Sequence, residues 1–240
     1  MFYIGAHCHC LLTTKEMSRR LQEFDTLAPW LNLGAAERNA LYAQGRIQNF
    51  AARQILIKEG APFVALYVVK AGNVKLCKVC GAKEQILEIL SPGDVVDPTP
   101  LFDGGNHAVT AKAMTPTQVY RFAPLVAQQL VMEHPAILNA LLNVMSLRLR
   151  RLAALANDLA FKDVTARVCS VLLEHAASGE TTLGGQKLCR PLTRQELAAL
   201  VGAAREVAWR TLKKLERDGL IKIQGSQIVI LDAAGLALRS

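Results

Sequence analysis

Long apolar runs and enzyme signatures are both missing from this 240-residue chain. Its longest apolar run, Phe63–Val69, is far shorter than the roughly 18–20 residues of a membrane-spanning helix. The sequence contains no nucleophile elbow, P-loop, zinc-protease or dinucleotide-binding signature, so we do not expect an enzyme. No basic stretch precedes the apolar N-terminal segment MFYIGAHCHCLL. We therefore expect no signal peptide, no membrane partner and a cytoplasmic location.

Cysteines and acidic residues are also scarce. The six cysteines are too few for a disulfide scaffold, so thiols, metal ligands or redox groups are expected instead. Lys and Arg number 28 against 20 Asp and Glu, which gives a formal charge of +8. This excess favours a polyanionic partner such as nucleic acid. Hydrophobic residues make up 51% of the chain, enough for a substantial core.

The pattern of apolar residues divides the chain into three predicted parts. In residues 1–133, short apolar runs alternate with Gly and Pro turn signals, as is typical of a β barrel or sandwich. A helix is expected before these strands, from about Ser18 to Gln44. Residues 134–160 are predicted to form one long helix, with Pro135 suited to its first turn. Residues 161–240 begin with another amphipathic helix and form the third part.

The long helix carries apolar residues at spacings of three and four, which form one stripe along its surface. The stripe consists of Leu138, Leu141, Met145, Leu149, Leu152, Leu155 and Leu159. A stripe of this kind packs either against the chain's own barrel or against a second copy of the helix. The length and continuity of the stripe favour a homodimer.

The third part contains a predicted helix-turn-helix. Thr193 and Glu196 have the T-x-x-E spacing of a capping box, which marks a helix start. Gly202 suits the tight turn that follows, and a second helix is predicted over residues 204–218. The alternating segment LIKIQGSQIVIL then predicts a two-stranded wing.

The second helix of this motif begins with charged residues. Arg205, Glu206 and Arg210 lie at the end that enters the major groove in helix-turn-helix proteins. Arg donates two hydrogen bonds to guanine, and Glu accepts one from cytosine. A solvated charged helix face is the alternative, but the surrounding capping box, turn and wing favour DNA recognition.

Three segments together resemble the CRP/FNR superfamily of bacterial transcription regulators: "AGNVKL…ILEILSPGD", "NDLAFKDVTARV" and "LTRQELAALVGAAREVAWRTLKKLERDGLI". The resemblance implies an α+β fold with an N-terminal cyclic-nucleotide-binding-like β-roll (jelly roll), a dimerisation helix and a C-terminal winged helix-turn-helix. It also implies a homodimer on palindromic double-stranded DNA, with RNA polymerase as a partner.

The resemblance also implies roles for individual residues. Arg205, Glu206 and Arg210 would contact bases of a TGTGA-like half-site. Trp209 replaces the small residue of the cyclic AMP receptor branch, so the resemblance does not specify the outer bases of the half-site. Family positions that touch backbone phosphates, and so fix register without reading bases, are occupied here by Thr193, Arg194 and Gln195.

The expected effector is not a cyclic nucleotide. The family's phosphate cassette carries a Gly-Glu-Leu segment and an Arg-Ser pair. Here Pro98 stands near the expected glutamate, and Asn106 and His107 stand near the expected Arg and Ser. Without arginine, a cyclic phosphate loses its charge-assisted bidentate partner.

The cysteines suggest a different effector. Cys77 and Cys80 form a C-x-x-C-G pattern at a predicted hairpin, similar to the metal knuckle of rubredoxins and zinc ribbons. Cys8 and Cys10 could supply the second half of a site for zinc, a metalloid or an iron–sulfur cluster. The leading hypothesis is therefore a regulator controlled by a thiolate-bound effector or by thiol redox state.

Two alternatives to cysteine sensing remain open at this point. Cys77 could pack as a small hydrophobe while Cys8 and Cys10 lie in a frayed tail. Haem is a further possibility, with His7, His9 or His107 as axial ligands. A cyclic-nucleotide-type or haem-sensing module without cysteine sensing is therefore the alternative function.

Overall fold

The structure is a computed structural model that describes Trp30 and residues 33–177, 181–182, 185–188, 191–225 and 227–240. Most of the expected N-terminal helix lies outside these residues, and its described part is α2 (Ala35–Gln44). Cys8, Cys10, His7 and His9 also lie outside them.

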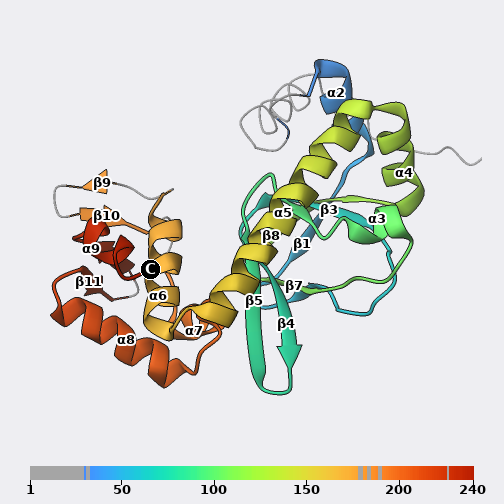
Figure 1. Ribbon diagram of the computed structural model, residues 1–240. Coiled ribbons are helices and arrows are strands. Elements are labelled where there is room, and N and C mark those ends of the chain that lie inside the picture. Colours follow the sequence, from blue (N-terminus) through green and yellow to red (C-terminus); the bar gives the residue numbers. More distant parts are fainter. Residues whose placement is uncertain (1–29, 31–32, 178–180, 183–184, 189–190, 226) are drawn as a thin grey trace, which may run out of the picture.

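Two four-stranded antiparallel sheets form the N-terminal β-roll (Figure 1). The first sheet has the order β1-β8-β3-β6 and the second the order β2-β7-β4-β5. Their strands are β1 (Arg46–Phe50), β2 (Ile55–Ile57), β3 (Leu66–Ala71), β4 (Val74–Cys80), β5 (Lys83–Leu90), β6 (Val95–Val96), β7 (Thr110–Ala113) and β8 (Thr117–Phe122). A buried apolar cluster that includes Phe50, Tyr67, Leu76 and Val119 lies between the sheets, as expected for strands whose alternate side chains face inward.

Helices cover one side of the roll and connect it to the C-terminal part. A short α3 (Thr99–Asp103) precedes β7, and α4 (Pro124–Glu133) follows β8. The long helix α5 (Pro135–Phe161) then crosses the roll and reaches the C-terminal part (Figure 1). The predicted helix therefore exists, with Pro135 in its first turn.

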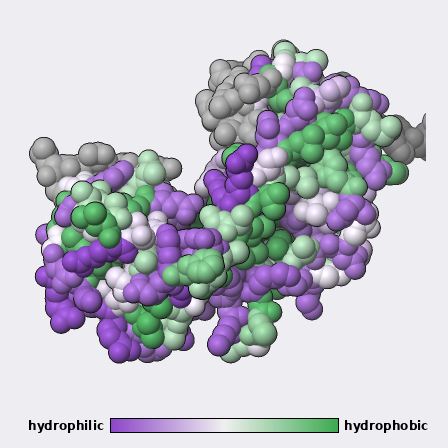
Figure 2. Space-filling view, viewed as in Figure 1, coloured by the Kyte–Doolittle hydropathy of each residue, from purple (hydrophilic) through white to green (hydrophobic). Residues whose placement is uncertain are grey.

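The surface of α5 changes character along its length. Its first two turns bury Ile137, Ala140 and Leu141 in the protomer's own core, together with residues of α4 and the roll. The expectation that Leu141 contacts a second copy is therefore corrected, because its side chain is 0% exposed within one protomer. Further along, large apolar residues on α5 are exposed, and Figure 2 shows hydrophobic residues following this helix.

The C-terminal part packs helices against a small sheet. It contains α6 (Val164–Ala177), α7 (Arg194–Val201), α8 (Arg205–Arg217) and α9 (Ala233–Ala237). The sheet has the order β11-β12-β10-β9, with β9 (Thr181–Thr182), β10 (Gly185–Lys187), β11 (Ile221–Gln224) and β12 (Gln227–Ile230). The two predicted wing strands are β11 and β12, so the expected α+β architecture with a winged helix-turn-helix is confirmed.

Among the described residues, only one bent pair of helices has the length and apolar composition of a membrane span. No single described helix has the length and apolarity of a membrane span, and only α4 and α5 taken together do. Their axes are bent by 108° at the break between them.

Candidate nucleic-acid interface

The helix-turn-helix is held by the local interactions that its sequence predicts. The Thr193 hydroxyl accepts a hydrogen bond from the Glu196 backbone N–H at 3.1 Å. In return, the Glu196 carboxylate accepts one from the Thr193 N–H at 2.8 Å, which completes the capping box. Gly202 ends α7 in the left-handed conformation with φ of 63°, where a residue with a Cβ would be strained.

Helix α8 presents a charged face outward and an apolar face inward. Ala208, Leu212 and Leu215 are buried in the C-terminal core. Arg205, Glu206 and Arg210 are exposed at the N-terminal end of the helix. Within the described residues, neither arginine of this face forms an ion pair. Their N–H groups are therefore available to an outside acceptor such as a base edge or a phosphate.

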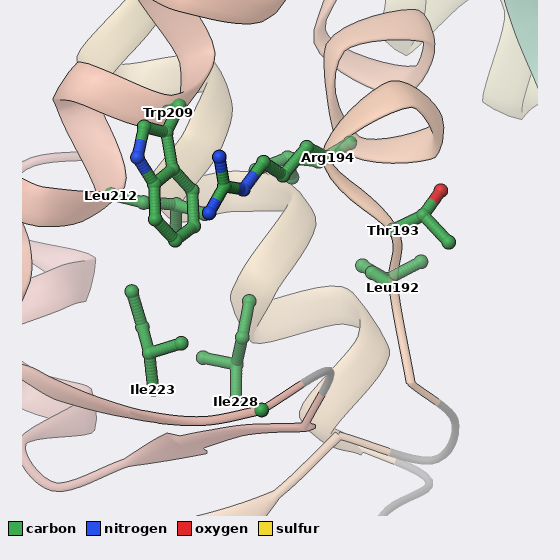
Figure 3. Close-up of a pocket in the computed structure, with 9 residues that line it drawn as sticks. Leu192, Thr193, Arg194, Trp209, Leu212, Ile223 and Ile228 are labelled. Atoms are coloured by element: carbon green, nitrogen blue, oxygen red, sulfur yellow. The ribbon is translucent and has the colours of Figure 1, made fainter.

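The expected phosphate-contacting residues lie beside this helix. Thr193, Arg194 and Gln195 are exposed at the start of α7. Trp209, in contrast, is only partly exposed and turns toward α7 and the wing (Figure 3). The guanidinium carbon of Arg194 lies 3.6 Å from the centroid of the Trp209 ring.

The cysteine pattern does not form a metal knuckle. Cys77 and Cys80 both lie in β4, which continues to its turn at Gly81. Residues three apart in a strand point to opposite faces, and here Cys77 is fully buried while Cys80 is exposed. Among the described residues, no group of three or more His, Cys, Asp or Glu side chains could hold a metal ion. The described residues therefore do not support the predicted two-thiolate half-site at Cys77 and Cys80.

Cys77 is also a poor sensor on chemical grounds. Burial, together with a hydrogen bond and repulsion from Glu84, raises the pKa of the Cys77 thiol to about 12. Its sulfur lies 3.6 Å from the Thr110 carbonyl oxygen, to which it donates. Because the thiolate is the reactive and metal-binding form, Cys77 behaves as a core residue.

A small cavity between the roll and α5 is lined by several charged side chains. Arg148 of α5 donates from Nε to Glu88 Oε2 at 2.6 Å and from Nη2 to the Val95 carbonyl at 3.0 Å. Arg151 pairs with the second oxygen of Glu88. The cavity has a volume of about 100 Å³ and is also lined by Asp97. Within the described residues, Nη1 of Arg148 is buried without a hydrogen-bond partner.

His107 is enclosed next to this cavity rather than exposed as a haem ligand. Its Nδ1 lies 2.9 Å from Asp97 Oδ2, and both side chains are almost fully buried. Asp97 has a positive φ of 34°, an uncommon conformation for a residue other than glycine. The cavity beside this pair is far too small for a macrocycle, so the expectation of His107 as a haem ligand is corrected.

The sensor domain contacts the helix-turn-helix directly. Gln85 of β5 donates from Nε2 to the Leu200 carbonyl near the end of α7, at 3.1 Å. Arg167 of α6 donates to the next carbonyl, that of Val201, at 2.8 Å. Both side chains thus satisfy carbonyls that the end of a helix leaves open. Figure 1 shows the β4–β5 hairpin beside α7.

Comparison with known proteins agrees with this architecture. Residues 47–134 match the model of the cyclic nucleotide-binding domain, and residues 166–239 match that of the Crp-like helix-turn-helix domain. The CRP-like cAMP-activated global transcriptional regulator of Mycobacterium tuberculosis is 31% identical over 203 residues, which cover 84% of this chain and 91% of that protein. The chain belongs to the CRP/FNR family of transcription regulators. It is thus a regulator and not an enzyme.

Two further relatives extend the comparison. The cAMP-activated global transcriptional regulator CRP of Salmonella typhimurium is 32% identical over 186 residues, covering 77% of this chain and 89% of that one. The c-di-GMP responsive regulator CLP of Xanthomonas campestris has a structure with a TM-score of 0.74, 29% identity and coverage of 82% and 99%.

The effector cassette does not fit a cyclic phosphate held as the family implies. Pro98 offers no carboxylate, and Asn106 is exposed while His107 is buried against Asp97. The two arginines at the cavity, Arg148 and Arg151, both pair with Glu88. Glu88, Arg148 and Gln85 are not among the residues that the sequence predicts for a site, because each acquires its role from a partner far away in the chain.

Proposed function

We propose that the chain is a homodimeric transcription regulator that binds palindromic double-stranded DNA through the exposed N-terminal face of α8. The observation that carries this proposal is the arrangement of Arg205, Glu206 and Arg210 on one exposed face of a capped helix-turn-helix. Arg205 and Arg210 would donate to guanine, and Glu206 would accept from cytosine. RNA polymerase is the expected further partner, in the cytoplasm where bacterial DNA is transcribed.

The exposed part of α5 supports the dimer. Three leucines of the predicted stripe are between 38% and 69% exposed, namely Leu149, Leu152 and Leu159. A helix that exposes so many leucines in a single protomer would leave a large apolar surface in water, which monomeric proteins rarely do. Pairing with α5 of a second copy covers this surface and places two recognition helices about one DNA turn, ~34 Å, apart.

The effector proposed for the sensor domain is a small anion in the cavity between the roll and α5. Arg148 lines this cavity, and its Nη1 is buried without a hydrogen-bond partner among the described residues; a buried donor of this kind favours a bound acceptor. The volume of about 100 Å³ is below the roughly 300–1,000 Å³ of typical ligand pockets. The ligand is therefore small, and thiolate coordination has no part in the proposal.

Strand β5 offers a direct connection from this cavity to the DNA-binding part. Glu88 of β5 lies at the cavity, and Gln85 of the same strand bonds to the end of α7. A ligand that shifts Glu88 would therefore act on the helix-turn-helix through one short strand. Such control requires the ligand to bind the two states of the protein with different affinities.

The effector is tested by thermal unfolding in the presence of small inorganic and carboxylate anions. At least one anion should raise the Tm of the wild type. Ala108→Leu serves as the matched variant, since it adds volume at an exposed position that lines the cavity. The same anion should leave the Tm of Ala108→Leu unchanged, and equal stabilisation of both proteins would contradict the site.

The DNA-binding proposal is tested by comparing Arg205→Ala with Arg194→Ala on a TGTGA-N6-TCACA duplex and on a shuffled duplex. Arg205→Ala should cost roughly 1–3 kcal/mol per half-site on the specific duplex and much less on the shuffled one. Arg194→Ala should weaken binding to both duplexes equally, because a phosphate contact carries no sequence information. Equal weakening of both duplexes by Arg205→Ala would overturn its assignment.

A further inference from the structure

Trp209 lies on the DNA-facing helix but turns away from the exposed charged face of that helix. Its ring forms one wall of a cavity of about 280 Å³ between α7, α8 and the wing, with Leu212, Ile223 and Ile228 among the other lining residues. Figure 3 shows the indole beside the guanidinium of Arg194, with Leu212 behind the ring and Ile223 and Ile228 below it. The indole is therefore fixed by its own domain before any DNA is bound.

The contact between Trp209 and Arg194 orders an otherwise exposed side chain. Arg194 is the first residue of α7 and is exposed, and no carboxylate among the described residues pairs with it. The distance of 3.6 Å from its guanidinium carbon to the ring centroid is that of a close cation–π stack. Stacking uses the flat face of the guanidinium and leaves the N–H groups at its edge free to donate.

Lys213 is a second cation near the Trp209 ring, but unlike Arg194 it has a carboxylate partner among the described residues. Nζ of Lys213 lies 5.1 Å from the Trp209 centroid, but it also donates to Glu216 Oε2 at 2.7 Å. The hydrogen bond from Lys213 lowers the pKa of Glu216, so this pair is charged. Lys213 is thus held by a carboxylate of its own helix, whereas Arg194 is held by the indole.

We propose that Trp209 is a positioning residue, which holds the Arg194 guanidinium in place to contact a DNA backbone phosphate. This inference rests on the proposed function and deepens it. A long arginine side chain loses rotamer freedom when it binds a phosphate, and stacking on the indole removes most of that freedom beforehand. Trp209 then contributes to affinity through Arg194 and does not read a base.

The test is a double-mutant cycle on DNA binding. Trp209→Leu keeps an apolar side chain of substantial size but removes the ring, and Trp209→Phe keeps an aromatic face. Trp209→Leu should weaken binding roughly three- to tenfold on both the TGTGA-N6-TCACA and the shuffled duplex. Trp209→Phe should recover most of that loss. In the Trp209→Leu background, Arg194→Ala should cost clearly less than it does in the wild type.

The salt dependence supplies a readout that a purely structural role would not change. Arg194→Ala should reduce the slope of log Kobs against log salt by about 1.8, because each protomer of the dimer loses one phosphate contact worth about 0.9 on duplex DNA. Trp209→Leu should reduce the slope in the same direction, and Trp209→Phe should not. Lys213→Ala is the comparison variant, because it removes a more distant cation near the same ring that Glu216 already holds, and it should couple to Trp209→Leu more weakly than Arg194→Ala does.

The possible failures are distinguishable. If the wild type shows no preference for the palindromic duplex, the proposed function fails, and this inference fails with it. If the wild type binds specifically but the effects of Arg194→Ala and Trp209→Leu simply add, only the positioning role fails. A change in base preference for Trp209→Leu would also overturn the inference, since it would assign base readout to the indole itself. If Trp209→Leu does not fold, the DNA affinities of Trp209→Phe and Arg194→Lys are compared instead. Stacking on the ring predicts that Trp209→Phe keeps most of the affinity and that Arg194→Lys loses affinity, because lysine lacks the planar fork.

Discussion

The DNA-binding part and the sensor part of this molecule differ in how exposed their charged side chains are and in whether those side chains are paired. In the DNA-binding part, Arg205 and Arg210 are exposed and form no ion pair within the described residues. In the sensor part, Arg148 and Glu88 are mostly buried and form an ion pair, and the buried His107 Nδ1 lies 2.9 Å from Asp97 Oδ2. Exposed cations contribute little to stability but are available to a polyanion, whereas enclosed pairs resist change unless a ligand replaces one partner.

The same contrast occurs within α5, and it predicts the largest effect. Leu141 is fully buried in one protomer, while Leu149 is 69% exposed. Leu149→Glu should abolish dimer formation and specific DNA binding, because it places two charges in the proposed interface, yet leave the stability of the protomer nearly unchanged. Leu141→Ala should destabilise the protomer by about 2–5 kcal/mol, as buried Leu-to-Ala changes do.

Sedimentation and thermal unfolding of the two leucine variants provide the check. A monomeric but well-folded Leu149→Glu protein supports the account. A Leu149→Glu protein that remains dimeric at micromolar concentration would show that α5 does not form the interface.

The enclosed charges predict the next largest effect. Arg148→Ala leaves Glu88, which is mostly buried, with only the exposed Arg151 as a partner, so it should lower the free energy of unfolding by about 3 kcal/mol. Arg150→Ala is the matched control on the same helix, because Arg150 is exposed and its loss should change stability by less than about 0.5 kcal/mol. Urea unfolding measures both. Similar small effects for the two arginines would remove the contrast between enclosed and exposed charge.

The cysteines of β4 predict the smallest effect. Burial raises the pKa of Cys77 to about 12, so at pH 8 its thiolate is almost absent and iodoacetamide should not modify it in the folded protein. Cys80 is exposed and should be alkylated readily, as peptide mapping by mass spectrometry would show.

The raised pKa of Cys77 also has a stability consequence. Because the folded pKa exceeds the unfolded value of about 8.5, the contribution of this group is complete below pH 8.5. It declines as the pH rises from there toward about 12. Cys80→Ser should leave both stability and DNA affinity unchanged, and a loss of DNA binding in this variant would restore a sensing role for the thiol.

The features that the sequence predicts correctly are those determined by local interactions. The capping box of Thr193 and Glu196 and the left-handed turn at Gly202 each depend on residues within one or two turns of helix. The same holds for α5, whose composition alone fixes a long helix. These signals placed the recognition helix and its exposed residues correctly.

The sensor part could not be predicted in the same way, because its features depend on distant partners. The C-x-x-C-G pattern does place Gly81 at the turn, but β4 continues as a strand through both cysteines with a bulge between Leu76 and Cys77. The Arg148–Glu88 pair joins residues 60 positions apart. No sequence spacing indicates that a positively charged residue of α5 faces the roll and lies at a cavity.

The most direct test of the account is a fluorescence anisotropy titration of the wild-type protein at fixed salt. It compares a TGTGA-N6-TCACA duplex with one in which a single half-site is shuffled and one in which both are. A dimer that uses both copies of α8 should prefer the palindrome to the fully shuffled duplex by at least roughly 10³-fold, and the half-shuffled duplex should lie between them. Equal affinity for all three duplexes would contradict the proposal that exposed residues of α8 read DNA sequence.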